Sequence, residues 1–143
     1  MKNEAGVRKW LKNSDPFGGK SLFWCEHRGG GTLGMVDVLV AVDGALYPVE
    51  LKFGGISAGE GGEEDGRWGV KLRPGQVAVH RRLAKLWVRS FILIGSELGN
   101  GVWIVDGGEA VKNIQNGTKM KSERVKDWIS LTTALKNGVG GPG

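Results

Sequence analysis

The chain has 143 residues, a formal net charge of +5 and one cysteine, Cys25. This length fits one small domain with a single core, and a lone cysteine excludes an internal disulfide, so we expect a cytoplasmic protein. The sequence has no apolar run long enough to span a membrane and no signal-peptide core near its start, and its two histidines lack zinc-ligand spacing.

The first part of the chain predicts a helix, a strand and a glycine-rich loop. Residues 3–13 have the periodicity of a short helix, with Glu4 in its first turn. Residues 21–26 form an apolar run that is typical of a strand. The glycines of residues 28–34 either let backbone N–H groups approach phosphates or form only a tight corner.

Residues 36–53 predict a β-hairpin. Two apolar runs flank Asp43-Gly44, a pair that favours a type I′ turn because both central residues of that turn need positive φ. With a two-residue turn, Asp37 lies directly opposite Glu50 on the neighbouring strand. The Cβ atoms of these two acids should then be about 4.5–5.5 Å apart.

Asp37, Glu50 and Lys52 share one face and one end of this hairpin. Like charges so placed repel, so the two acids need a proton or a cation, and a divalent metal held by both carboxylates is the simplest solution. Both faces are otherwise largely apolar, so other elements should cover both. Alternatively, the charges lie only where the strands emerge into solvent, and the hairpin alone does not distinguish these interpretations.

The rest of the chain predicts further elements of one domain. Residues 54–69 are rich in glycine and have no apolar period, so we expect a mobile loop. The elements that follow are a helix from Pro74 to about Val88, strands at 91–94 and 102–105, a last helix over 122–136 capped by Ser122, and a flexible tail at 138–143. This order, α-β-β-β-α-β-β-α, predicts a single α/β domain over residues 1–137, with a mixed sheet flanked by helices.

Two of these helices are expected to turn an apolar side toward a core. In the helix from Pro74, that side contains Val79, Leu83, Leu86 and Trp87. In the last helix, it contains Val125, Trp128, Ile129, Thr132 and Leu135.

Positive charge is concentrated between residues 66 and 96, which hold seven basic residues and no acidic one. Arg81, Arg82, Lys85 and Arg89 follow helical spacing and predict one basic stripe. A stripe of one sign suits a nucleic-acid backbone, whereas a solvated helix face usually carries both signs. The residues expected to contact nucleic acid are Arg28, Gly30, Lys71, Arg73, Arg81, Arg82, Lys85 and Arg89.

Three motifs follow one another in the chain: Asp37, then Glu50-x-Lys52 on the next strand, and a downstream Gln76 that opens a helix. The order of these motifs resembles the PD-(D/E)xK nuclease superfamily. Within it, the chain is most similar to the small virus-type (VRR-NUC-like) nucleases and the Holliday-junction resolvases. The resemblance covers roughly residues 4–105 and includes the glycine-rich approach to the aspartate.

This resemblance implies a role for each matching residue. The implied metal ligands are Asp37, Glu50, the Leu51 carbonyl and Glu4, and the implied catalytic residues are Asp37, Glu50, Lys52 and Gln76. Two of these have ordinary alternatives, since Glu4 is an acid favoured at a helix N-terminus and Gln76 can make local first-turn bonds. Val36 departs from the pattern, because it stands where the superfamily name has proline, but that position shapes the backbone and binds no metal.

The resemblance therefore implies a restriction-endonuclease-like core and a DNA endonuclease, phage or prophage encoded, that depends on Mg²⁺ or Mn²⁺. We expect a homodimer in the host cytoplasm, with DNA as its partner and no organic cofactor or membrane. The alternatives are an inactive nucleic-acid-binding module with the same fold, and an assembly or packaging protein that docks through its last helix. The sequence leaves open whether the substrate is a junction, a flap, duplex or single strands.

Overall fold

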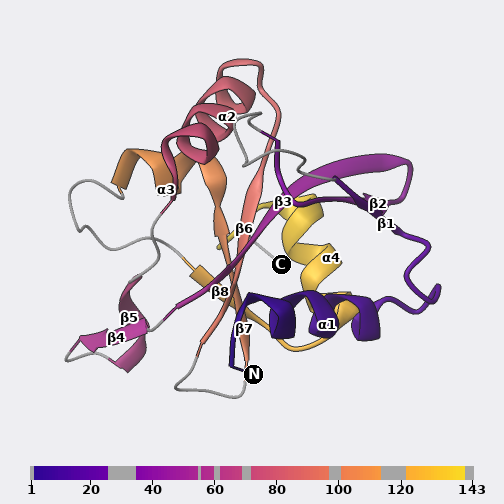
Figure 1. Ribbon diagram of the computed structural model, residues 1–143, viewed down its shortest axis with the longest axis horizontal. Helices are drawn as coiled ribbons and strands as arrows, with labels where there is room; N and C mark the ends of the chain where they lie inside the picture. The colour runs from indigo at the N-terminus through magenta and orange to yellow at the C-terminus, as the bar shows by residue number, and fades with distance from the viewer. Residues whose placement is uncertain are drawn as a thin grey trace.

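The computed structural model describes residues 2–25, 35–54, 56–59, 62–68, 72–96, 101–113 and 122–140. In spatial order, the strands of its large sheet are β1 (Leu22–Trp24), β2 (Val38–Val42), β3 (Ala45–Phe53), β6 (Phe91–Gly95), β7 (Val102–Asp106) and β8 (Ser122–Val125). A second sheet pairs β4 (Ile56–Gly59) with β5 (Gly62–Trp68), and the helices are α1 (Glu4–Ser14), α2 (Pro74–Lys85), α3 (Gly107–Asn113) and α4 (Trp128–Asn137). Figure 1 shows this arrangement. Because β3 and β6 are parallel and the other neighbours in the large sheet are antiparallel, the fold is an α/β domain with a mixed sheet, as predicted.

The β2–β3 hairpin forms in the predicted register. Val38 pairs with Val49, so the next opposed pair is Asp37 and Glu50. The two turn residues have φ of 48° and 83°, the positive values that a type I′ turn requires. The turn chemistry therefore sets which residues meet at the far end of the hairpin.

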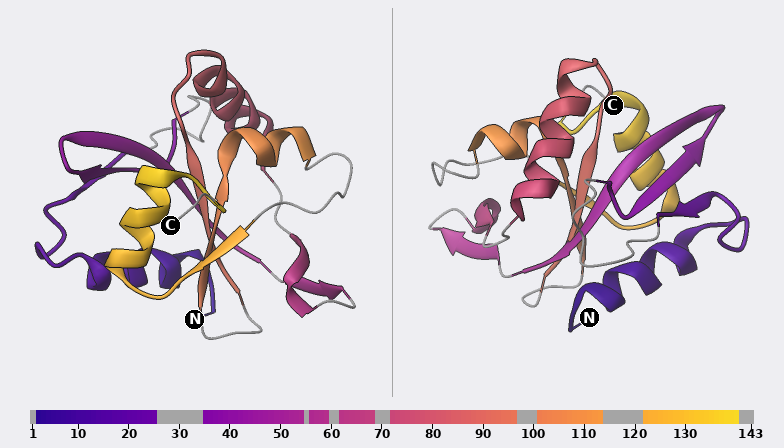
Figure 2. Two further views of the ribbon diagram at one scale, coloured as in Figure 1. Left: turned by 180° about the vertical axis from the view of Figure 1, so that it is seen from behind. Right: turned by 45° about the horizontal axis from the view of Figure 1, so that its top comes forward.

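Helices cover both faces of the large sheet, and Figure 2 shows them from two further sides. Toward α1 and α4, the core contains Val7, Leu11, Val38, Val49, Leu51, Phe91, Leu93, Leu131 and Leu135. Toward α2 and α3, a smaller cluster contains Ile92, Ile94, Val105 and Ala110, with Leu72 against it. In the parallel β3–β6 ladder, Glu50 and Lys52 pair with Ile92 and Ile94, so both charged side chains point to the α2–α3 face.

Helix α2 ends three residues earlier than predicted, at Lys85. Trp87 has φ of 63°, in the left-handed region, and the Val88 N–H donates to the Leu83 carbonyl at 2.9 Å. This turn interrupts the helical repeat. Leu86 and Trp87 are consequently 64% and 94% exposed, and the prediction that they face a core is wrong.

The last helix begins at Trp128, not near Ser122. Residues 122–125 instead form β8, because the edge of β7 offers them backbone hydrogen bonds. Asp127 caps α4, its Oδ1 accepting a first-turn N–H at 2.8 Å. The buried side of α4 contains Leu131, Thr132, Ala134 and Leu135, whereas Ile129, predicted to face a core, is 74% exposed.

Four elements extend the predicted order. Helix α3 and strand β8 were not predicted, and β4 and β5 form an antiparallel pair within residues 54–69, where the sequence predicted a loop. The expected mobility of that segment stays a prediction. In the described part of the chain, no helix is long and apolar enough to cross a membrane.

Candidate functional site

Asp37 lies where β2 begins and is held by two hydrogen bonds. Its carbonyl oxygen accepts the Cys25 N–H at 2.9 Å, and its Oδ2 accepts the Leu51 N–H at 2.8 Å. The carboxylate thus takes the place of the backbone acceptor that would continue the β2–β3 ladder, and the hairpin opens here. Within a strand the N–H and C=O of one residue point to the same edge, so the Leu51 carbonyl also points toward Asp37.

Glu50 is buried beside Asp37. Only 1% of its surface is exposed, and no described residue donates a hydrogen bond to either carboxyl oxygen. A buried polar group without a partner is costly, so such groups are rare and mark places where a water or an ion completes the interaction. The parallel ladder to β6 fixes this costly carboxyl in place.

Burial raises the pKa of Glu50 to about 9. The second cause is Asp37, which can share a proton with Glu50 and whose negative charge disfavours a second negative charge beside it. The charge of Glu4 raises the pKa of Glu50 further, and the charge of Lys52 lowers it. Without a cation, Glu50 is therefore protonated at neutral pH. A cation that binds here must displace this proton.

Glu4, Lys52 and Arg73 bring further charges around the two acids. The pKa of Glu4 is raised, first by partial burial of its carboxyl and then by the charge of Asp37, while Lys52 and Arg73 act to lower it. These mutual effects place the charges of Glu4, Asp37, Glu50 and Lys52 within electrostatic range of one another. Of the three predicted acids, the hairpin register itself brings together only Asp37 and Glu50.

The donor set can be compared with what a hard divalent cation needs. Among the described residues, no three His, Cys, Asp or Glu side chains lie close enough together to hold a metal ion. Mg²⁺ commonly takes only one or two carboxylates and fills its other positions with water and substrate phosphates. The orphaned oxygens of Glu50, the Asp37 carboxylate and the Leu51 carbonyl fit that pattern, and Glu4 stays a prediction as a further ligand.

Gln76 has a structural role at the start of α2. Its Oε1 accepts the Arg73 backbone N–H at 2.9 Å, which is the half of a capping box that the third helical residue supplies. This is the local bond that the sequence offered as the alternative to a catalytic role. A contact between Gln76 and the acids stays a prediction.

The predicted nucleic-acid contacts lie in different places. Arg73, Arg81, Arg82 and Lys85 are exposed at the start or on the surface of α2. Arg89 lies beyond the end of the helix and donates to the Lys136 carbonyl of α4 at 3.3 Å, so the prediction of one four-residue helical stripe is wrong for Arg89. Arg28, Gly30 and Lys71 lie outside the described residues.

His80 was not singled out from the sequence, although the charge of Asp37 acts on it. It is 0% exposed, its Nδ1 lies 2.7 Å from Ser90 Oγ, and its Nε2 has no hydrogen-bond partner in the described part of the chain. Burial lowers the pKa of His80 to about 4, against the opposing charges of Asp106 and Asp37, so it is neutral at pH 7. The available signal was spacing, because His80 follows Gln76 by four residues and lies on the same side of the helix.

No family model fits the sequence, and no curated protein is significantly similar to it.

Proposed function

We propose that this chain is a metal-dependent DNA endonuclease. Its active site for phosphodiester hydrolysis would contain Asp37, Glu50 and Lys52. The observation that carries the proposal is the Glu50 carboxyl, which is buried beside a second acid, Asp37, and to whose oxygens no described residue donates a hydrogen bond. A protein keeps such a costly arrangement where a ligand completes it. Lys52, two residues along the same face of β3, adds a cation next to the acids.

A restriction-endonuclease-like core is part of this proposal. Three observations support it: α1 precedes the antiparallel strands β1–β2–β3, β3 runs parallel to β6, and α2 lies between those two strands in sequence. This is the order that the resemblance implies, with the β4–β5 hairpin inserted before α2.

The residues of the site have separable tasks. Asp37 and Glu50 would hold Mg²⁺ or Mn²⁺, with the Leu51 carbonyl beside them. When bound, the ion supplies charge for a phosphate oxygen and lowers the pKa of a water molecule. Glu50 would have to be ionised to act as a ligand, so binding of the ion would release its proton to solvent. Lys52 donates to the phosphate, where negative charge grows during hydrolysis, or orients the attacking water.

Exposed cations would extend the DNA contact beyond the carboxylates. Arg73 precedes α2, and Arg81, Arg82 and Lys85 are exposed along it, without an acidic residue between positions 66 and 96. Contacts of this kind go to phosphates and carry no sequence information, so we expect binding that is independent of DNA sequence.

A cleavage assay tests this proposal. Purified wild-type protein, Asp37→Asn and Glu50→Gln are incubated with junction, flap, duplex and single-stranded DNA, with and without Mg²⁺. We expect the wild type to cleave only with Mg²⁺, and each variant to be slower by about 100-fold or more. Glu109→Gln, the same exchange at an exposed acid of α3, is the control that should keep full activity. Full cleavage by Glu50→Gln would contradict the site, and DNA binding without any cleavage would identify the inactive binding module.

A further inference from the structure

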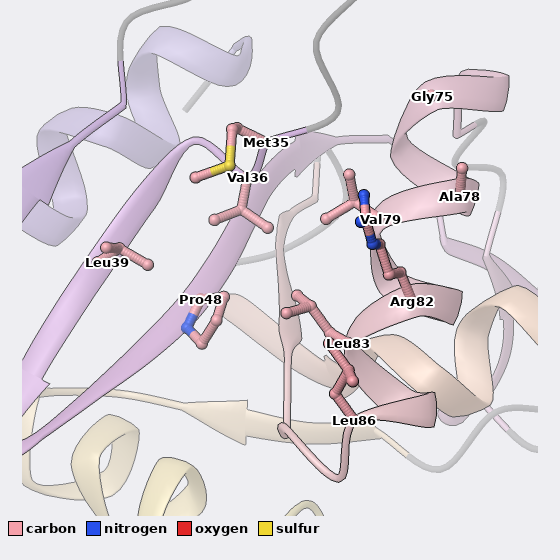
Figure 3. Close-up of a pocket in the computed structure, with 10 residues that line it drawn as sticks. All are labelled: Met35, Val36, Leu39, Pro48, Gly75, Ala78, Val79, Arg82, Leu83 and Leu86. Atoms are coloured by element: carbon pink, nitrogen blue, oxygen red, sulfur yellow. The ribbon is translucent and has the colours of Figure 1, made fainter.

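A cavity of about 460 Å³ opens between the β2–β3 hairpin and α2 (Figure 3). Leu39 and Pro48 line it from the hairpin, and Val79 and Leu83 line it from the helix. Arg82 is the charged residue of this lining among the described residues. The volume of the cavity lies in the range of about 300–1,000 Å³ that is typical of sites for small organic ligands.

The cavity belongs to the same face of the hairpin as the two acids. Leu39 follows Asp37 by two residues on β2, and Pro48 precedes Glu50 by two residues on β3, so all four side chains point to the α2 side. At the strand rise, two residues span about 7 Å. That distance is about two nucleotide steps along a stacked DNA strand.

Charge restricts what can occupy the cavity. The helix that walls it exposes Arg81, Arg82 and Lys85, and no acidic residue lies between positions 66 and 96. A second copy of this chain would bring the same positive helix to the same place and be repelled, whereas an anionic ligand with apolar parts would be attracted. A DNA strand whose base has left the stack is such a ligand, because its phosphates are anionic and the flat faces of its base are apolar.

We propose that this cavity binds one unpaired nucleobase, about two nucleotides from the phosphate that is cleaved. The inference rests on the proposed function and narrows its substrate to DNA that contains unpaired nucleotides. Duplex bases are stacked and paired, so they enter the cavity only at an unstacking cost. Since the lining offers aliphatic surface and Arg82, it holds any base, and Arg82 stacks on that base or binds its phosphate.

The test is metal-free binding, measured by fluorescence anisotropy of a labelled single strand and of the matching duplex. Val79→Trp fills the cavity from the helix without changing charge. Ile129→Trp makes the same kind of exchange on α4, where the side chain is 74% exposed and far in sequence from the cavity. We expect Val79→Trp to weaken binding of the single strand by about tenfold or more and to leave duplex binding unchanged, and Ile129→Trp to change neither.

Three results overturn the inference. If Val79→Trp binds the single strand with wild-type affinity, no unpaired base enters the cavity. The same holds if Val79→Trp loses affinity equally for the single strand and the duplex. If the wild type sediments as a dimer and Val79→Trp sediments as a monomer, a second copy of the chain fills the cavity. If circular dichroism shows that Val79→Trp does not fold, Leu83→Gln provides a near-isosteric polar lining and must weaken single-strand binding selectively. Cleavage that survives Glu50→Gln would end the proposed function but would leave this metal-free result standing.

Discussion

The two faces of the β2–β3 hairpin have similar apolar content in the sequence and different surroundings in the fold. Toward α1 and α4, the side chains of Val38, Val40, Val49 and Leu51 are at most 1% exposed. Toward α2, Leu46 is 55% exposed, a cavity remains open, and Glu50 is buried while no described residue donates a hydrogen bond to its carboxyl oxygens. One face thus supplies the stability of the domain, and the other keeps a surface whose interactions are incomplete without a ligand.

Substitutions of two neighbouring residues on β3, Glu50 and Leu51, should show the largest difference between the two faces. Leu51→Ala removes packing from the closed face and should lower the free energy of unfolding by about 2–5 kcal/mol. Glu50→Gln, one residue away on the other face, should abolish cleavage and leave the unfolding free energy of the metal-free protein unchanged or higher, because a protonated carboxyl and an amide are similar in shape. Urea unfolding and cleavage rates measure both. If Glu50→Gln destabilised the protein as much as Leu51→Ala, Glu50 would be a structural residue.

The α2–α3 face is tightly packed at its other end, around Gly107. A Cβ atom there would collide with the His80 imidazole and with Ser90 Oγ at 2.5 Å. Gly107→Ala should therefore lower the free energy of unfolding by about 1–3 kcal/mol, because both polar groups are fixed by their mutual hydrogen bond. Gly108→Ala is the matched control, since its Cβ would lie 3.2 Å from Asp106 Oδ1 and 3.4 Å from the Ala84 Cβ. Equal thermal stability of the two variants would show that the His80 environment can expand.

The sequence predicts the hairpin and its acids because these depend on local rules. Asp43-Gly44 determines the turn, the turn determines the register, and the register places Asp37 opposite Glu50. The structure confirms this predicted register. It could be predicted because it depends on no residue outside the hairpin.

The ends of the helices and the cavity depend on contacts that a local pattern does not contain. The apolar period continues through Leu86 and Trp87, yet the chain turns there into the left-handed region and exposes both. Ser122 has the chemistry of a helix cap, but its segment completes the sheet beside β7. Alternation likewise predicts that both faces of the hairpin should be covered, and only the assembled fold shows where the cover on the α2 side is incomplete.

The pH dependence of stability should distinguish the faces more finely. The pKa of Glu50 is about 9 in the folded protein, against an ordinary value of 4.5, so between these limits only the folded state keeps the proton. The free energy of unfolding should therefore fall as pH rises through this window, by at most about 1.4 kcal/mol per pH unit. Glu50→Gln should remove that slope.

Urea unfolding without metal between pH 7 and 9 measures this effect. His80 does not interfere there, because its pKa of about 4 in the folded state lies below its ordinary 6.5, and its contribution is lost only as pH falls through those values. Glu109→Gln, at an exposed acid, should keep the wild-type slope. A slope that persists in Glu50→Gln would mean that another group takes up the proton.

The smallest expected effect separates the basic residues of α2 from Arg89. Replacing Arg81, Arg82 and Lys85 together with glutamine should make the slope of log K against log salt shallower by about 0.9 for each duplex phosphate that these side chains neutralise. Arg89→Gln should leave the slope unchanged, because this side chain donates to the Lys136 carbonyl at the end of α4. An unchanged slope in the triple variant would mean that this side of α2 is only a solvated face. DNA would then have to reach the acids from the α1 side, where Arg8 lies 4.3 Å from the centre of the Trp24 ring and its charge partly opposes the rise in the pKa of Glu4.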